Sequence, residues 1–207
     1  MTLKYTLTDE TMEYQGHTLH RIKALKDLKS ASGVVLVKKD DLGGWVEIED
    51  NLSQFGMAWV YGNAKLLDIS FVCEEAEIFD NAIIRDGAEI RENAVVADNS
   101  VVQENSTVRD HATIRDCAVV SGEVIVRDHA TICGDATVTK DSDYLMFRNH
   151  WSSGRAFTWT RSNDMWKVGC FYGTGRELIA KAYADSETSG NYYEFYVDFV
   201  ERLKRLG

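Results

Sequence analysis

An aliphatic residue returns every six positions through the middle of the chain, from Val60 to Val138. A helix repeats about every 3.6 residues and a strand about every two, so neither explains this period. A triangular coil with three short strands per turn does explain it, because each six-residue segment then forms one side. The repeating positions are Val60, Leu66, Val72, Ile78, Ile84, Ile90, Val96, Val102, Val108, Ile114, Val120, Val126, Ile132 and Val138.

Small residues and turn residues follow the same period. Alanine or serine comes four positions after each aliphatic residue, with Val124 as the exception, and suits the crowded corners of a narrow prism. Aspartate, glutamate or glycine comes two positions after each from Val60 to Ile132, as tight turns with left-handed backbone require. The phase continues back to Leu42, with Gln54 as a polar interruption, so we predict nearly six coils over residues 42–143.

The run V-R-D-H-A-T-I-R-D-C-A-V-V, residues 108–120, resembles the hexapeptide repeat of left-handed β-helix proteins. Residues 38–47, K-K-D-D-L-G-G-W-V-E, are similar to uncharacterised bacterial and phage proteins that are often labelled transferases on their fold alone. The resemblance implies left-handed coiling and a homotrimer. The family includes acyltransferases, carbonic anhydrases and proteins without a known activity, so the resemblance specifies a fold more closely than a function.

We expect three domains: an N-terminal β cap at residues 1–41, the β-helix at 42–143 and an α+β module at 144–207. In the cap, a hairpin that turns at Gln15 and Gly16 is followed by a buried strand at residues 34–37. The cap would cover the open sheet edge of the first coil.

The tail is expected to form three short antiparallel strands and two helices. These lie at residues 144–151, 156–161, 165–171, 175–184 and 192–206. Thr174 can cap the first of the two helices. The predicted fold class is therefore mainly β, a left-handed parallel β-helix of nearly six triangular coils with a small α+β domain.

The formal net charge is −10, and most of the excess acid falls on the predicted corners of the coils. Turn chemistry and solubility explain this charge, whereas interleaved arginines argue against mimicry of nucleic acid, and we expect no direct nucleic-acid binding. We find no apolar run long enough to span a membrane and no signal-peptide core. The four cysteines show no paired framework, so we expect a cytoplasmic protein.

One outward face of the coils carries apolar residues, which implies that something covers it. Two symmetry mates in a homotrimer would supply that cover, and the tail helix is the alternative. The predicted interface residues are Leu67, Ile83, Val101 and Val119, with Arg85 and Gln103 beside them.

His111 and His129 are 18 positions apart, in one column of the coil. In the hexapeptide acyltransferases a histidine deprotonates the acceptor, so these two are the candidate catalytic bases and acetyl-CoA is the candidate cofactor. The coils lack the long loop that usually encloses the acceptor in those enzymes. The paired histidines that hold the metal of hexapeptide carbonic anhydrases are also missing, and we predict no metal and no other cofactor.

Arg91, Arg109 and Arg127 stack on another face and are candidates for binding an anion. The alternative is that neighbouring acids pair with them internally. These acids are Glu92, Asp110 and Asp128.

Aromatic and arginine side chains are dense in the tail. Such sets stack bases or nucleotide ligands, and they also build the core of a small domain. The contact candidates are Arg148, Trp151, Arg155, Trp159 and Arg161.

The chain contains no phosphate loop, nucleophile triad or zinc motif. We therefore predict a non-enzymatic β-helical binding or scaffold protein, in the form of a phage or prophage accessory that sequesters a ligand or blocks a host protein. Its partner would be that host protein or a small anionic or nucleotide ligand. The alternative is a trimeric hexapeptide acyltransferase that uses acetyl-CoA.

Overall fold

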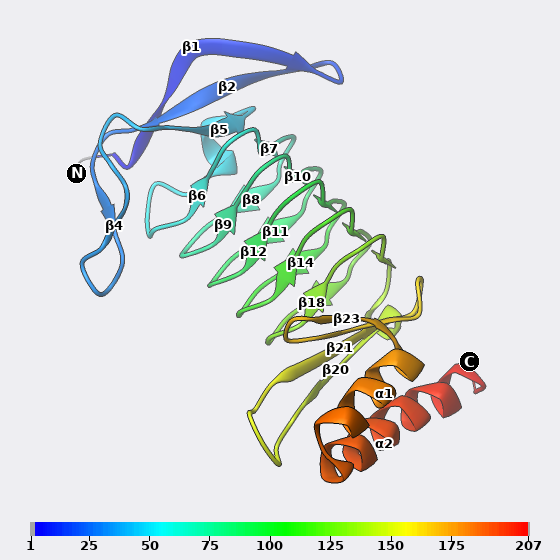
Figure 1. Ribbon diagram of the computed structural model, residues 1–207. Coiled ribbons are helices and arrows are strands. Elements are labelled where there is room, and N and C mark those ends of the chain that lie inside the picture. Colours follow the sequence, from blue (N-terminus) through cyan, green and yellow to red (C-terminus); the bar gives the residue numbers. More distant parts are fainter. Residues whose placement is uncertain (1–2, 207) are drawn as a thin grey trace. The chain divides into compact units, whose positions relative to one another are not determined.

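The computed structural model describes residues 3–206 and divides the chain into two compact units, Met1–Asp143 and Tyr144–Gly207 (Figure 1). The first unit is a β-solenoid of about five turns that follows a long hairpin. The second unit is a four-stranded antiparallel sheet with two helices. None of the helices within residues 3–206 is both long and apolar enough to cross a membrane.

Two-residue strands form the sides of the coils, and each pairs in parallel with the strand one turn away (Figure 1). These strands are β6 (Trp59–Val60), β7 (Lys65–Leu66), β8 (Phe71–Val72), β9 (Glu77–Ile78), β10 (Ile83–Ile84), β11 (Glu89–Ile90), β12 (Val95–Val96), β13 (Val101–Val102), β14 (Thr107–Val108), β15 (Thr113–Ile114), β16 (Val119–Val120), β17 (Ile125–Val126), β18 (Thr131–Ile132) and β19 (Thr137–Val138). Short 3-10 helices, η1 (Glu49–Asn51) and η2 (Asp141–Asp143), lie at the start and the end of the coils.

The core of the solenoid consists of the three predicted aliphatic columns. Every repeating aliphatic residue from Val60 to Val138 is 0% exposed, and so are the corner alanines. Register confirms the stacking, because Ile84 pairs with Val102 and Val102 pairs with Val120. Burial of such a side chain contributes about 1.5–3 kcal/mol, so the repeated columns hold the coils together.

The acidic corner residues form ladders of hydrogen bonds along the solenoid. Each has a positive φ, for example 58° at Asp110 and 61° at Asp128. Within a ladder, the carboxylate of one residue accepts a hydrogen bond from the backbone N–H of the equivalent residue one coil further on, as in the 3.0 Å bond from the Asp128 N–H to Asp110 Oδ2. The carboxylate ladders comprise Asp68, Asp86 and Glu104; Glu74, Glu92, Asp110 and Asp128; and Asp80, Asp98, Asp116 and Gly134. Turn and hydrogen-bond chemistry therefore account for the acidity of the corners.

The ladders predict that the solenoid loses stability in acid. The N–H of Asp128, helped by the charges of Arg109 and Arg127, lowers the pKa of Asp110 below its ordinary value. A carboxyl whose folded pKa is lowered adds stability above its unfolded pKa of about 3.9, and this contribution disappears as the pH falls through the folded value. Urea unfolding at about pH 7 and about pH 3 should show the decline, and Asp110→Asn should flatten it.

The matched control for this prediction is Asp9→Asn, on an exposed part of the hairpin that lies outside the ladders. It should leave the pH dependence of the unfolding free energy as it is in the wild type. An Asp110→Asn protein with the full wild-type pH dependence would contradict a role for the ladder in acid stability.

The first coil is out of phase with the rest by two residues. Val46 and Leu52 are buried, and each pairs with an aliphatic residue 20 positions further on rather than 18. Leu42 and Ile48, which the period placed inside, are 52% and 43% exposed. The prediction that Leu42 and Ile48 face inward and that the coils number nearly six was therefore wrong, because two additional residues lie before Val60, although β5 of the solenoid sheet does begin at Leu42.

The segment between Leu52 and Val60, which contains the two additional residues, is hydrogen-bonded to the beginning of the hairpin. The Gln54 side chain accepts a hydrogen bond from the Lys4 N–H at 2.8 Å and donates one to the Tyr5 carbonyl at 3.2 Å. The Lys4 ammonium donates to the Ala58 carbonyl at 2.8 Å, and burial lowers the pKa of Lys4 to about 8. The Tyr5 hydroxyl donates to the Leu52 carbonyl at 2.8 Å.

The hairpin consists of β1 (Tyr5–Tyr14) and β2 (His17–Ala24). Gln15 and Gly16 have φ of 51° and 91°, which confirms the predicted two-residue turn. β2 pairs in antiparallel fashion with β5 (Leu42–Val46), so the hairpin continues the sheet that contains β7, β10 and β13.

The predicted buried strand at residues 34–37 was largely wrong. β4 (Val35–Val37) pairs only with β3 (Leu28–Lys29) in a separate two-stranded sheet. Val34 is 58% and Leu36 48% exposed, and Val37 alone is buried. Leu28 and Val37 of this pair are buried, whereas Val34, Val35 and Leu36 remain exposed on the segment that projects from the hairpin (Figure 1).

The second unit is an antiparallel meander followed by two helices. Its elements are β20 (Tyr144–Arg148), β21 (Ala156–Thr160), β22 (Met165–Val168), β23 (Phe171–Thr174), α1 (Gly175–Asp185) and α2 (Glu187–Lys204). The sheet has four strands where three were predicted, because the backbone turns at Gly169, which has a φ of 56°.

Both helices of the second unit begin at hydrogen-bonded caps. The Thr174 hydroxyl accepts a hydrogen bond from the Glu177 N–H, and the Glu177 carboxylate accepts one from the Thr174 N–H, which confirms the predicted cap. α2 begins before the predicted residue 192, because the Ser186 hydroxyl accepts a hydrogen bond from the Ser189 N–H.

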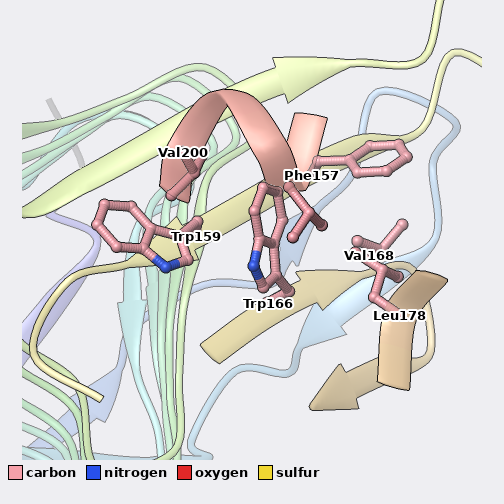
Figure 2. Close-up of a cluster of buried hydrophobic side chains, with 7 residues drawn as sticks. Phe157, Trp159, Trp166, Val168, Leu178 and Val200 are labelled. Carbon is pink, nitrogen blue, oxygen red and sulfur yellow. The ribbon is translucent and has the colours of Figure 1, made fainter. Parts of the chain in front are cut away.

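The core of the second unit lies between its sheet and its helices (Figure 2). Trp159 is 1% exposed, and its Nε1 donates a hydrogen bond to Asp164 Oδ1 at 2.9 Å. The expectation that Trp159 contacts a ligand was wrong, because its ring is packed inside this core. The buried residues are Phe157, Trp159, Trp166, Val168, Leu178, Val197 and Val200.

Candidate functional site

The tip of the hairpin packs against the outward face of the solenoid. Leu67, one of the predicted interface residues, is 2% exposed there. The chain's own hairpin thus covers it, whereas a symmetry mate or the tail helix was expected to do so. The cluster contains Leu19, Trp45 and Leu67, with Met12, Tyr14 and Ile83 packed against them.

The predicted interface residues fall in two neighbouring rows rather than one. One row contains Lys65, Ile83, Val101 and Val119. The other contains Leu67, Arg85 and Gln103. Leu67 comes directly after a buried residue of the aliphatic columns. Ile83, Val101 and Val119 each come directly before such a residue, so they lie in a different row from Leu67.

A groove of about 320 Å³ lies between the hairpin tip and these two rows. Its floor is apolar, and its polar rim includes Arg85, which donates hydrogen bonds to Gln103 Oε1 from Nε at 2.9 Å and from Nη2 at 2.6 Å. The residues that line this hairpin groove are Tyr14, Gln15, Ile83, Arg85, Val101, Gln103 and Val119.

Lys65 fixes the wall of the hairpin groove. Its ammonium lies 5.0 Å from the centroid of the Tyr14 ring and donates a hydrogen bond to the Asn63 carbonyl at 2.8 Å. Burial lowers the pKa of Lys65. A cation–π contact of this kind contributes about 0.5–2 kcal/mol, which holds the Tyr14 ring beside the groove.

A second group of side chains, His17, Glu47 and Asp68, joins the hairpin to the solenoid. We name it the His17 cluster. His17 begins β2, Glu47 follows β5 and Asp68 is the first acid of a carboxylate ladder. His17 Nδ1 lies 3.1 Å from both carboxylate oxygens of Glu47 and 3.9 Å from Asp68 Oδ1. Arg85 of the groove rim lies 3.7 Å from Asp86, whose N–H donates to Asp68, so the cluster lies near that rim.

The contact between His17 and Glu47 favours the charged forms of these two side chains. The hydrogen bond with Glu47 raises the pKa of His17, against the effects of desolvation and of Arg85. Desolvation opposes ionisation of Glu47, but the Asp68 N–H and the His17 ring outweigh it, and the pKa of Glu47 is lowered.

Sequence reasoning missed Tyr14, Gln15 and the His17 cluster. The members of the cluster are 30 and 21 positions apart and share no motif. One signal was present: Glu47 is an outward-facing acid beside a strand, whereas the acids of the later coils fall mainly at corners. Recognition of its partners required the path of the hairpin.

His111 and His129 stack on an exposed corner of the solenoid. Their ring centroids are 4.9 Å apart and the rings are nearly parallel, at 6°. The structure thus brings the two together as predicted from the column, but away from the residues that line the hairpin groove.

The stacked arginines each have a local acidic neighbour. The nitrogen–oxygen distances are 3.7–3.9 Å, and such exposed pairs contribute about 0–1 kcal/mol. Arg91 pairs with Glu89 instead of the expected Glu92, whose carboxylate accepts a hydrogen bond from the Asp110 N–H. The pairs are Arg91 with Glu89, Arg109 with Asp110 and Arg127 with Asp128.

The tail candidates do not form one aromatic surface. Trp151 is half-buried and stacks on Tyr192, with centroids 4.1 Å apart, while Trp159 lies in the core. Arg148, Arg155 and Arg161 are exposed. The tail thus offers one stacked aromatic pair rather than a platform for successive bases.

Neither a protein-family model nor a curated protein sequence matched the chain. We infer a function from the hairpin groove and the His17 cluster.

Proposed function

We propose that the chain is a non-enzymatic binding protein that holds a small amphipathic anion in the hairpin groove. The observation that supports this is the composition of the groove, an apolar floor with one guanidinium at its rim. Ile83, Val101 and Val119 suit an apolar body, and Arg85 suits a carboxylate, sulfonate or phosphate.

The same composition favours binding over catalysis. The lining residues include no acid, histidine, cysteine or serine, so the groove itself has no ordinary nucleophile or general base. His111 and His129, the candidate bases of the acyltransferase alternative, lie on an exposed corner. The coils from Val60 to Val138 also continue without an acceptor loop. Acetyl-CoA is therefore expected not to bind.

The proposal includes a left-handed coil, a hairpin that caps it and a homotrimer. Single left-handed residues at successive corners and the resemblance to hexapeptide-repeat proteins support the left-handed coil. Val101 and Val119 remain partly exposed beyond the hairpin, and a neighbouring copy would cover them and close the groove. A role as a phage or prophage accessory rests on the resemblance alone.

The groove can be tested with 8-anilinonaphthalene-1-sulfonate, a fluorescent probe that has an apolar body and an anionic end. Val101→Asp places a charge on the floor and Arg85→Gln removes the guanidinium, so each should weaken binding about 10-fold or more. The matched control is Val95→Asp. Val95 is the outward-facing residue of β12, as Val101 is of β13, and it is partly buried to the same degree, but it lies on another face of the solenoid.

Probe binding that is equal in Val101→Asp and Val95→Asp would contradict the groove proposal. Calorimetry of the same samples with acetyl-CoA provides the comparison, and micromolar binding would favour the acyltransferase alternative. Light scattering of the wild type tests assembly, where a monomeric mass would refute the trimer and leave the groove intact.

A further inference from the structure

The His17 cluster presents one nitrogen and two carboxylates to a common point. Their potential ligand atoms all lie within 4.8 Å of one another, and the side chains are between 26% and 33% exposed. His111 and His129 bring only two potential donors together on the solenoid surface. In the His17 cluster, three donors converge from the hairpin and from two successive coils. The partial exposure leaves a path for an ion and room for water ligands.

Backbone hydrogen bonds orient both carboxylates. Glu47 Oε2 accepts a hydrogen bond from the Asp68 N–H at 2.6 Å, and both oxygens of this carboxylate lie 3.1 Å from His17 Nδ1. Asp68 Oδ2 accepts one from the Asp86 N–H at 3.1 Å, which leaves Oδ1 directed to His17 at 3.9 Å. Each carboxylate is thus held by one oxygen and offers the other. Such hydrogen bonds to ligating carboxylates are typical of the surroundings of metal sites.

We propose that His17, Glu47 and Asp68 bind a divalent transition-metal ion of the zinc class. Donor atoms around a tetrahedral zinc ion lie about 3.3 Å apart, and the distances of 3.1 and 3.9 Å from His17 Nδ1 span this value. Imidazole with carboxylates suits zinc and its neighbours, whereas magnesium and calcium prefer oxygen donors alone. Two ionised carboxylates neutralise the charge of the ion, and one or two waters complete its coordination.

A bound ion would join the hairpin to the solenoid. His17 belongs to the hairpin, and Glu47 and Asp68 belong to two successive coils. The site does not exist in the unfolded chain, so metal binding adds to the stability of the folded hairpin. Metal should therefore raise the melting temperature of the first unit in proportion to the logarithm of its concentration.

Two alternative arrangements compete with this metal site. In the first, the His17 ring alone ties the hairpin to Glu47 through a hydrogen bond, with no ion. In the second, a zinc ion added in solution binds the stacked, exposed pair His111 and His129, whose ring centroids are 4.9 Å apart. A test must separate these three arrangements.

The experiment uses the full-length chain freed of metal with a chelator. Zinc chloride is titrated by calorimetry, with magnesium chloride as the comparison, and cobalt chloride reports the coordination by its visible absorption. His17→Gln keeps an N–H that can bond to Glu47 and removes the imidazole ligand. Asp68→Asn keeps an oxygen acceptor for the Asp86 N–H and removes the charge. The matched control is His129→Ala, which removes a histidine of the competing pair.

We expect one zinc ion per chain, with affinity at least about 100-fold weaker in His17→Gln and in Asp68→Asn and unchanged in His129→Ala. Circular dichroism identifies any variant that fails to fold. Failure of the wild type to bind zinc, or wild-type affinity in folded His17→Gln, overturns the proposal. Loss of binding in His129→Ala alone assigns the ion to the corner pair and also overturns it. Probe binding in the hairpin groove is a separate measurement, so either result stands without the other.

Discussion

Val102→Asp is expected to unfold the solenoid. Val102 is 0% exposed in the middle of an aliphatic column, between Ile84 and Val120 on the adjacent coils. A carboxylate there has no partner and must either stay charged in an apolar core or take up a proton well above its ordinary pKa, at a cost of about 4–5 kcal/mol. That amount is comparable with the total stability of many domains, and packing strain adds to it.

Hydrogen exchange read by mass spectrometry measures this effect coil by coil. Peptides from residues 59–138 should exchange rapidly in Val102→Asp. The control is Val101→Asp, one residue earlier, where the side chain faces outward and is partly exposed. Wild-type protection in Val102→Asp, or equal loss in both variants, would show that the inward and outward assignments are wrong.

The coils were predictable because their stability is local and repeated. Each aliphatic residue packs on its equivalent one turn away, so the period of the sequence reproduces the geometry of the core from Val60 onward. The same reasoning failed at Leu42 and Ile48, because two additional residues before Val60 shift the phase. The period of the later coils carries no information about an insertion that lies outside them.

The candidate site was predictable only in part. The outward apolar residues Ile83, Val101 and Val119 were predicted as an interface with another subunit, and in the structure they form the floor of the hairpin groove. The wall was missed, because the position of Tyr14 depends on how the hairpin bends onto the solenoid. The His17 cluster arises from the same long-range packing, in which no short spacing in the sequence brings the three donors together.

The tail candidates failed for a different physical reason. Tryptophan and arginine suit both ligand stacking and a small core, and composition does not distinguish the two uses. The meander of β20 to β23 needs large apolar side chains on the face that meets α1 and α2. Trp159 and Trp166 are therefore buried in this core and do not face a ligand. Trp151 at the edge keeps a partly open face.

Trp166→Ala is expected to unfold the second unit and to leave the solenoid folded. Trp166 is 1% exposed and belongs to the cluster in Figure 2, so its truncation leaves a large cavity that costs about 3–5 kcal/mol. A small unit with one compact core has little stability to spare. The solenoid should persist, because its buried columns contain no residue of this cluster.

Circular dichroism at about 222 nm measures the outcome, because α1 and α2 are the only α-helices among residues 3–206 and both lie in the second unit. The helical signal should be lost at room temperature in Trp166→Ala, while peptides of the coils keep their wild-type protection from hydrogen exchange. Trp151→Ala is the control, since the half-buried ring at the edge should cost about 1–2 kcal/mol and leave the helices formed. A Trp166→Ala protein that melts near the wild-type temperature would contradict the assignment of this side chain to the core. Simultaneous loss of coil protection would show instead that the two units fold as one.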